Sequence, residues 1–241
     1  MWDRPDALNA IARWLSGLAA LALLYAAVLL VTRLPLFPLR EVRISGALAH
    51  VTRAQVQEIV RDKLAGNFFT LDLARTRNTF EKLPWVRTAE VRRYWPDVVE
   101  VAIEEHVPLA RWGSHGLVNT QGEVFEANVD AKLPMFIGPP GSAKEIAIQY
   151  AYFHKTLEPI RQAPLQVQVS LRRAWQLRLD SGLTLELGRE HVENRLSKFV
   201  TVYDRTIGQL NRRLDYVDLR YANGFAVRVP ELSKPETKVR G

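Results

Sequence analysis

The chain of 241 residues contains no cysteine. It therefore cannot form a disulfide, carries no catalytic thiol and cannot bind a metal through a cysteine thiolate. The absence does not identify the compartment, because many exported proteins also lack cysteine.

Histidine is scarce, and no histidine has the spacing of a metal site. A zinc-binding helix needs two histidines one turn apart on the same face. The nearest group, Glu190-His191-Val192-Glu193, offers a single histidine at the expected start of a helix. The five histidines are His50, His106, His115, His154 and His191. We therefore predict that the protein has no metal site.

Other catalytic patterns are also missing. Gly113-Ser114-His115-Gly116 lacks the G-x-S-x-G spacing of a nucleophile elbow. The segment GPPGSAK at 138–144 lacks the Gly-Lys-Ser/Thr ending of a phosphate-binding loop, and its Ser142 is expected to cap a helix. Glu104 and Glu105 are neighbours on a predicted strand, so their side chains point to opposite faces. We expect no cofactor and no enzymatic activity.

The charge is positive but dispersed. Lys and Arg total 33 against 26 Asp and Glu, a formal charge of +7 at pH 7. Nucleic-acid binding would require a basic stripe with stacking aromatic residues, and the sequence has none. The excess is better explained by a solvated surface beside anionic lipid.

Long hydrophobic runs are absent except for one, from Trp14 to Val31, which has no charged residue. As a helix it spans about 27 Å, close to the hydrocarbon thickness of a bilayer. A cleaved signal peptide would be shorter and followed by a small-residue cleavage site. A buried core helix would show a polar stripe. We predict a membrane anchor at residues 14–34, after a stub at residues 1–13.

The direction of the anchor is not decided by charge. The short side has Arg4 and Arg13, and the long side has Arg33, Arg40 and Arg43. Lys and Arg tend to remain cytoplasmic, but long translocated domains are largely exempt from that rule. The roughly 205 residues after the anchor suit one large domain or two small ones.

Residues 39–105 have the pattern of a compact α+β module. Val42 and Ile44 alternate with polar residues, which is typical of a half-buried strand. The remaining features are a helix begun by Thr52 and Gln55 as a capping box and stopped by Gly66, a helix capped by Asp72 and ended by Pro84, and a hairpin turning at Trp95-Pro96-Asp97. The order strand, helix, helix, strand, strand predicts two helices on one face of a small sheet.

Residues 107–230 predict a strand-rich domain with two helices. Hairpins are expected around Gln121-Gly122, Asp180-Ser181-Gly182 and Ala222-Asn223-Gly224, where alternating strands flank turn residues. Apolar residues at helical spacing predict helices over 146–160, behind a Ser142/Glu145 capping box, and over 192–207. The charged segment 231–241 has no apolar pattern and is expected to be disordered.

Several segments together resemble the FtsQ/DivIB family of bacterial cell-division proteins. They are FPLREVRISG, NFFTLDL, LPWVRTAEVRRYWPDVVEVAIEEHVPLARW, LVNTQGEVF, LPMFIGPPGS and YVDLRYANG. The resemblance implies an α+β protein with a single transmembrane helix. It further implies a POTRA (polypeptide-transport-associated) domain at residues 37–106 and a β domain at residues 107–230.

The resemblance also implies a function. Such proteins are scaffolds of the inner membrane, with a cytoplasmic N-terminus and a periplasmic bulk at the division septum. The expected partners are FtsB and FtsL at the end of the β domain and other divisome proteins at the POTRA domain. An alternative is a POTRA protein that handles unfolded envelope substrates, which would have several such modules or an attached β-barrel.

The last hairpin is the predicted partner site. A strand that ends at Pro230 is expected at a sheet edge, where it can accept a strand from another chain or can simply complete the sheet. Tyr221 is either a contact residue or a core aromatic on the face of Val217 and Leu219. By resemblance the partner-binding residues are Arg172, Arg220, Tyr221, Asn223, Gly224, Phe225, Val227 and Val229. The resemblance also implies that Asn223 and Val229 stand where some family members have Ser and Trp.

Overall fold

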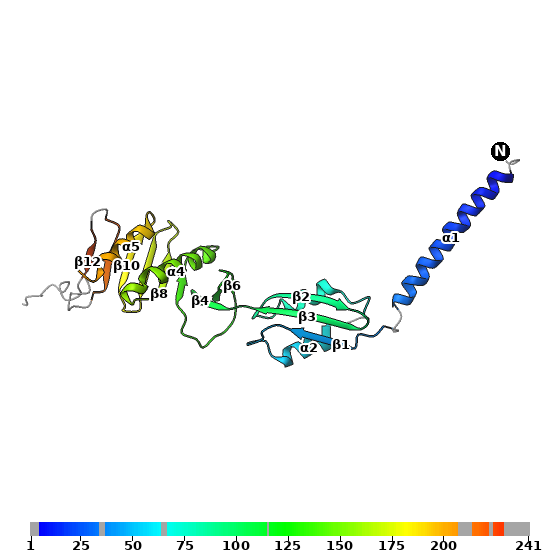
Figure 1. Cartoon of the computed structure of the whole chain (residues 1–241), viewed down its shortest axis with the longest axis horizontal. Coiled ribbons are helices and arrows are strands. Elements are labelled where there is room, and N and C mark those ends of the chain that lie inside the picture. The colour runs from blue at the N-terminus through cyan, green and yellow to red at the C-terminus, as the bar shows by residue number, and fades with distance from the viewer. Residues whose placement is uncertain are drawn as a thin grey trace, which may run out of the picture. The chain divides into compact units, whose positions relative to one another are not determined.

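The computed structural model describes residues 5–33, 37–63, 67–114, 116–206, 214–221 and 224–228. The features expected at Gly66, His115, Ile207 and the 231–241 tail lie outside these residues. The chain divides into two compact units, Met1–Glu105 and His106–Gly241 (Figure 1).

The apolar run forms part of one long helix, α1 (Pro5–Arg33). Its segment Asn9–Thr32 contains an 18-residue window with a mean hydropathy of 2.3, and none of that window is buried against the rest of the protein. It is the single helix among the described residues that is long and apolar enough to cross a membrane. Residues 5–13, predicted as a stub, continue the same helix.

The remainder of the first unit has the predicted order of elements. They are β1 (Glu41–Ser45), α2 (Arg53–Lys63), α3 (Leu73–Phe80), β2 (Val86–Tyr94) and β3 (Val98–Glu105). The sheet order is β1-β3-β2, with β1 parallel and β2 antiparallel to β3. The α+β class with a βααββ module is confirmed.

Both helix starts follow the sequence signals. The backbone N–H of Gln55 donates to Thr52 Oγ1 at 3.3 Å, and Gln55 Oε1 accepts from the Thr52 N–H at 2.9 Å, a reciprocal capping box. Asp72 Oδ1 accepts from the Arg75 N–H at 2.9 Å and caps α3.

The predicted end of α3 was too late. The helix ends at Phe80, four residues before Pro84. The N–H of Leu83 bonds to the Phe80 carbonyl, and the N–H of Val86 bonds to the Leu83 carbonyl, each at 3.0 Å. These two turns direct the chain into β2. Proline therefore follows the helix end without causing it.

The core of this module joins both helices to one face of the sheet. Val99 and Val101 of β3 and Phe80 of α3 are fully buried, and Val56 of α2 is 6% exposed. Because alternate residues of a strand share a face, this burial leaves the other face of β3 to solvent and charged side chains.

The described residues of the second unit form one nine-stranded sheet and two α-helices. The elements are β4 (Pro108–Trp112), β5 (Gly116–Asn119), β6 (Val124–Phe125), β7 (Met135–Ile137), α4 (Ala143–Leu157), the 3₁₀ turn η1 (Glu158–Ile160), β8 (Pro164–Val169), β9 (Trp175–Leu179), β10 (Thr184–Gly188), α5 (Val192–Tyr203), β11 (Tyr216–Asp218) and β12 (Ala226–Arg228). The strand order is β12-β11-β10-β9-β8-β7-β4-β5-β6. Phe136, Phe153 and Phe199, from β7, α4 and α5, anchor its core.

The capping box predicted at Ser142 and Glu145 is wrong. Ser142 has helical backbone angles, and its hydroxyl donates to the Pro139 carbonyl at 2.7 Å instead of capping α4. The Glu145 carboxylate pairs with Arg173 in the turn between β8 and β9. Ser142 therefore closes the preceding turn, and Glu145 ties the helix to a neighbouring loop.

Candidate functional site

The predicted hairpin lies at one edge of the large sheet. β12 pairs antiparallel with β11, with Val227 opposite Val217, and β11 pairs in parallel with β10. Among the described strands, none pairs with the other side of β12. All three side chains of β12 are exposed, Val227 by 40%. An edge strand of this kind presents backbone N–H and C=O groups to another chain.

Tyr221 lies outside the core. Val217 and Leu219, which share its period in the sequence, are 0% and 4% exposed, but Tyr221 is 61% exposed. The β-pairing of β11 ends at Asp218, so the alternation that buries the first two residues no longer applies. The Tyr221 ring is therefore available for contact beside the edge strand.

Phe225 and Gly224 have different roles. Phe225 is half-buried and packs edge-on against Phe199 of α5, with 6.4 Å between ring centroids. It therefore attaches the edge strand to the domain core. Gly224 is exposed, and a Cβ at this position would meet nothing within 4 Å. Predicted site residues Asn223 and Val229 lie outside the described residues.

Arg220 is already paired within the chain. Its Nε donates to Asp218 Oδ1 at 2.9 Å, its Nη2 donates to Asp218 Oδ2 at 2.7 Å, and its backbone N–H donates to Oδ1 at 3.0 Å. The hydrogen bonds from the Arg220 side chain hold the pKa of Asp218 below its usual range. The Arg220 side chain remains 55% exposed, so a partner carboxylate can reach a guanidinium whose orientation is already set.

Two residues that sequence reasoning missed support this arrangement. Arg195 of α5 donates to the Leu187 carbonyl at 2.6 Å and to the Arg220 carbonyl at 3.2 Å. Gly188 has a φ of +72°, and a Cβ there would lie 3.0 Å from Arg195 Nη1 and 3.1 Å from Arg220 Cγ. The arginines thus approach the end of β10 because position 188 has no side chain.

Arg172 lies at the same end of the sheet. It is exposed in the turn between β8 and β9. The register places Trp175 opposite Gly188, and β11 runs parallel to β10 toward that same end, where Arg220 follows it. Two strand spacings, about 10 Å, separate β9 from β11. The topology therefore brings Arg172 to the end of the sheet that carries Arg220 and Tyr221.

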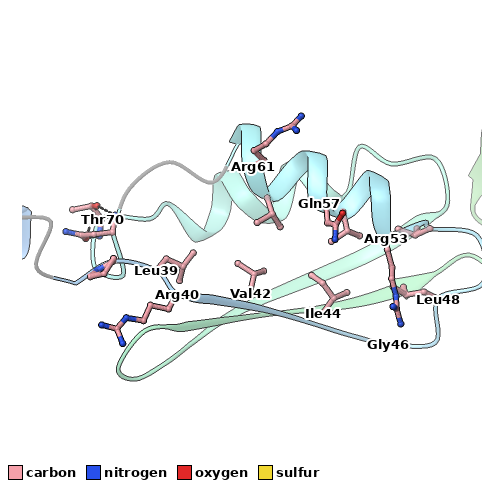
Figure 2. A pocket seen from close by; sticks show the side chains of 15 residues that line it. Leu39, Arg40, Val42, Ile44, Gly46, Leu48, Arg53, Gln57, Arg61 and Thr70 are labelled. Atoms are coloured by element: carbon pink, nitrogen blue, oxygen red, sulfur yellow. Dashed lines mark hydrogen bonds between the residues drawn. The ribbon is translucent and has the colours of Figure 1, made fainter.

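A second candidate surface is a groove in the first unit, between β1 and α2 (Figure 2). It has a volume of about 1190 Å³. β1 is the edge strand of the small sheet, and its Val42 and Ile44 point into the groove. Other lining residues include Leu39, Arg40, Arg53, Val56 and Gln57. The groove thus combines an apolar floor with basic residues.

Comparisons with known proteins identify the family. A family model described as "Cell division protein FtsQ/DivIB, C-terminal" matches residues 110–220, and one described as "POTRA domain, FtsQ-type" matches residues 37–106. Cell division protein FtsQ of Nitrosospira multiformis is 52% identical over 233 residues, covering 95% of this chain and 99% of the relative. The chain belongs to the FtsQ/DivIB family. FtsQ of Burkholderia pseudomallei is 42% identical over 235 residues, covering 95% and 94%. FtsQ of Neisseria gonorrhoeae is 32% identical over 237 residues, covering 98% of each chain.

Membership confirms the resemblance seen in the sequence. The protein is a cell-division protein of the FtsQ family with a POTRA domain. Together with the apolar helix α1, the relatives indicate a single-pass membrane protein. The FtsQ/DivIB match ends at residue 220, so Tyr221 and β12 both lie beyond the matched segment. Among the residues that the structure describes, no cluster of His, Asp and Glu could hold a metal ion.

Proposed function

We propose that this protein is a divisome scaffold that binds FtsB and FtsL at its C-terminal sheet edge and thereby links them to other division proteins at midcell. It acts by stoichiometric binding, without turnover. The observation that carries this proposal is the edge position of β12, with exposed side chains and Tyr221 beside it. The N-terminus lies in the cytoplasm and both domains lie in the periplasm, in line with the family.

The binding mode follows from the chemistry of the edge. A partner strand that pairs with β12 gains main-chain hydrogen bonds, which give affinity without requiring a particular sequence. Tyr221 adds a flat aromatic surface with little side-chain entropy to lose, which is typical of a binding hot spot. Arg220 and Arg172 supply positive charge at the same end of the sheet, so the partner segment should carry carboxylates.

Cysteine cross-linking tests the proposed strand addition, since the chain has no native cysteine. A single cysteine replaces exposed Ala226 on β12, and cysteines are scanned along FtsB co-expressed with the full-length chain. Strand addition predicts disulfides at every second FtsB position, because successive side chains of a strand point to opposite faces. Val124→Cys, at the opposite sheet edge and 49% exposed, is the matched control and should give no such ladder.

A second measurement tests the hot spot. Tyr221→Ala should reduce co-purification of FtsB at least tenfold, the effect expected when an aromatic hot spot is truncated. Val124→Ala should leave it unchanged. FtsB capture that is unaffected by Tyr221→Ala, together with no cross-link at position 226, would refute the assignment of this edge.

For other division proteins, we propose the groove between β1 and α2 as the contact site. Its basic residues Arg40 and Arg53 favour an extended acidic segment, which would pair with the open side of β1 (Figure 2). The same groove would serve the alternative function, binding of unfolded envelope substrates. Competition separates the two, because a scaffold should retain one acidic peptide when challenged with unrelated unfolded chains, whereas a substrate-handling protein should exchange it.

A further inference from the structure

We infer that the end of the POTRA module formed by Phe37, Phe69, Tyr94 and Trp95 lies in the headgroup region of the membrane that α1 crosses. This end is called the aromatic end below. The inference goes beyond partner binding and requires only that α1 spans a bilayer. It assigns a lipid surface to a set of exposed aromatic residues that neither candidate site uses.

The first observation is how short the connection to the membrane is. Four peptide links join Arg33, the last residue of α1, to Phe37, which is at most about 14 Å of chain. The side-chain amide of Asn67 donates to the Thr32 carbonyl at 2.7 Å, and the Phe68 N–H donates to the Phe37 carbonyl at 3.0 Å. The loop that carries Phe69 is therefore hydrogen-bonded to Thr32, near the end of α1, and to Phe37, which follows it.

The second observation is the exposure of large aromatic rings at this end. Trp95 is 79% exposed, Tyr94 is 47% and Phe69 is 43%. Phe37 packs edge-on against Phe69, with 5.0 Å between ring centroids. Aromatic rings are enriched where membrane proteins meet the headgroup layer, because one part of the ring is apolar and Trp and Tyr also carry a polar group. In water, the same rings would form an unfavourable apolar patch.

Hydrogen bonds hold these residues together. The hairpin tip is fixed beside the first strand, because the Arg40 N–H donates to the Asp97 carbonyl at 3.1 Å. The guanidinium of Arg93 donates to the carbonyls of Phe69 and Leu71. The tip with Trp95 and the loop with Phe69 are thus joined through Arg93, and the aromatic end is one connected surface.

The charge at this end favours anionic lipid. Arg40 and Arg93 are both exposed there. Asp97 is the acidic side chain that faces Arg40, at 3.5 Å, and Arg92 pairs with Glu90 on the neighbouring part of β2. Arg93 donates to two uncharged backbone carbonyls, so its positive charge is left for a lipid phosphate. Each basic residue near an anionic surface adds to membrane attraction over about a Debye length.

A nitroxide spin label tests the proposal in the full-length chain reconstituted in lipid nanodiscs. The absence of native cysteine allows a single label at Trp95→Cys. The control is Ala47→Cys, exposed at the far end of the same sheet and about 23 Å away along the strands. We expect the label at 95 to be several-fold less accessible to an aqueous nickel reagent, and more accessible to oxygen, than the label at 47. The contrast should be larger with phosphatidylglycerol present than in phosphatidylcholine alone.

A second readout keeps Trp95 in place. Brominated lipids should quench more tryptophan fluorescence in the unsubstituted protein than in Trp95→Phe. Equal nickel accessibility at positions 95 and 47 in both lipid mixtures, with no loss of quenching in Trp95→Phe, overturns the proposal. Protection at position 95 that appears only when FtsB or another protein is added would also overturn it and would assign the aromatic end to a protein partner.

Discussion

Glu105 at the end of β3 holds the turn that precedes α2, and its replacement by Gln offers a sharp test of how the POTRA module is stabilised. The Glu105 side chain is 6% exposed. Its carboxylate accepts hydrogen bonds from the backbone N–H groups of Ala49 at 3.0 Å, His50 at 3.0 and 3.2 Å, and Val51 at 2.8 Å. Both carboxylate oxygens of Glu105 accept hydrogen bonds. In Glu105→Gln, the side-chain NH₂ group replaces one of these oxygens and faces backbone N–H groups, with which it cannot form a hydrogen bond.

The size of the effect depends on which N–H group can be rehydrated. Ala49 and His50 are exposed, but Val51 is 8% exposed and its N–H has little access to water. Loss of one charge-assisted hydrogen bond from a buried group costs about 2 kcal/mol. This corresponds to a roughly thirtyfold change in a local opening equilibrium. Glu105→Gln should therefore lower the hydrogen-exchange protection of the Val51 amide about thirtyfold.

The control is Glu90→Gln, the same substitution at an exposed ion pair with Arg92 on the same sheet. It should leave the Val51 amide unchanged, because exposed ion pairs contribute little. Protection of Val51 that falls less than threefold in Glu105→Gln would show that water or a neighbouring group replaces the carboxylate and would refute the reasoning.

The same carboxylate predicts a pH dependence. Burial by itself would raise the pKa of Glu105, but the N–H groups of Val51, Ala49 and His50 outweigh it and lower the pKa below its usual value. A depressed carboxylate pKa stabilises the fold at any pH above the unfolded-state pKa, and the contribution is lost as pH falls through the folded-state pKa. The difference in urea midpoint between the unsubstituted protein and Glu105→Gln should thus be full at about pH 7 and shrink below about pH 4.

Two further substitutions have defined outcomes. Asp218→Asn removes the anion that orients Arg220, so it should weaken FtsB capture several-fold by pull-down while the thermal unfolding temperature changes little; unchanged capture would show that this pair does not prepare the site. Gly46→Ala should destabilise the first unit by at least about 2 kcal/mol in urea unfolding, because φ is +129° and the added Cβ would overlap the Ile103 carbonyl oxygen. Gly141→Ala is the control, because φ is +83° but nothing lies within 4 Å of the added Cβ, and it should cost about 1 kcal/mol. Equal losses of stability in Gly46→Ala and Gly141→Ala would contradict the clash with Ile103.

Much of the fold could be predicted because burial follows local periodicity. Trp175, Leu177 and Leu179 alternate with polar residues, and all three are buried in β9. β7 was not predicted, because it has three residues, follows Pro134 and pairs in parallel with two strands distant in sequence. Such pairing is decided by the assembled sheet, and a three-residue segment is too short to show a period.

Tyr221 shows where periodicity fails at the site itself. Val217, Leu219 and Tyr221 have the spacing of one strand face, which left a core position and a contact position equally open. The Asp218 carboxylate accepts the backbone N–H of Arg220 and draws the chain into an Asx-type turn, so regular pairing stops before position 221. A short acid–x–Arg motif that begins at the last residue of a buried strand is the sequence signal that could have placed Tyr221 outside the core.

The intramolecular pair also determines how affinity is divided at the edge. A partner carboxylate that reaches Arg220 shares a guanidinium already bound by Asp218, whose own side chain is 8% exposed and cannot move away freely. The partner therefore gains less than it would from an unpaired arginine held in the same orientation, while a mismatched positive charge meets Arg220 and Arg172 together. Affinity should come mainly from Tyr221 and the backbone of β12, and charge should act on partner choice and association rate. Arg220→Ala should accordingly slow FtsB association more than it speeds dissociation, whereas Tyr221→Ala should do the reverse, and the opposite pattern in surface plasmon resonance would show that the arginine carries the affinity.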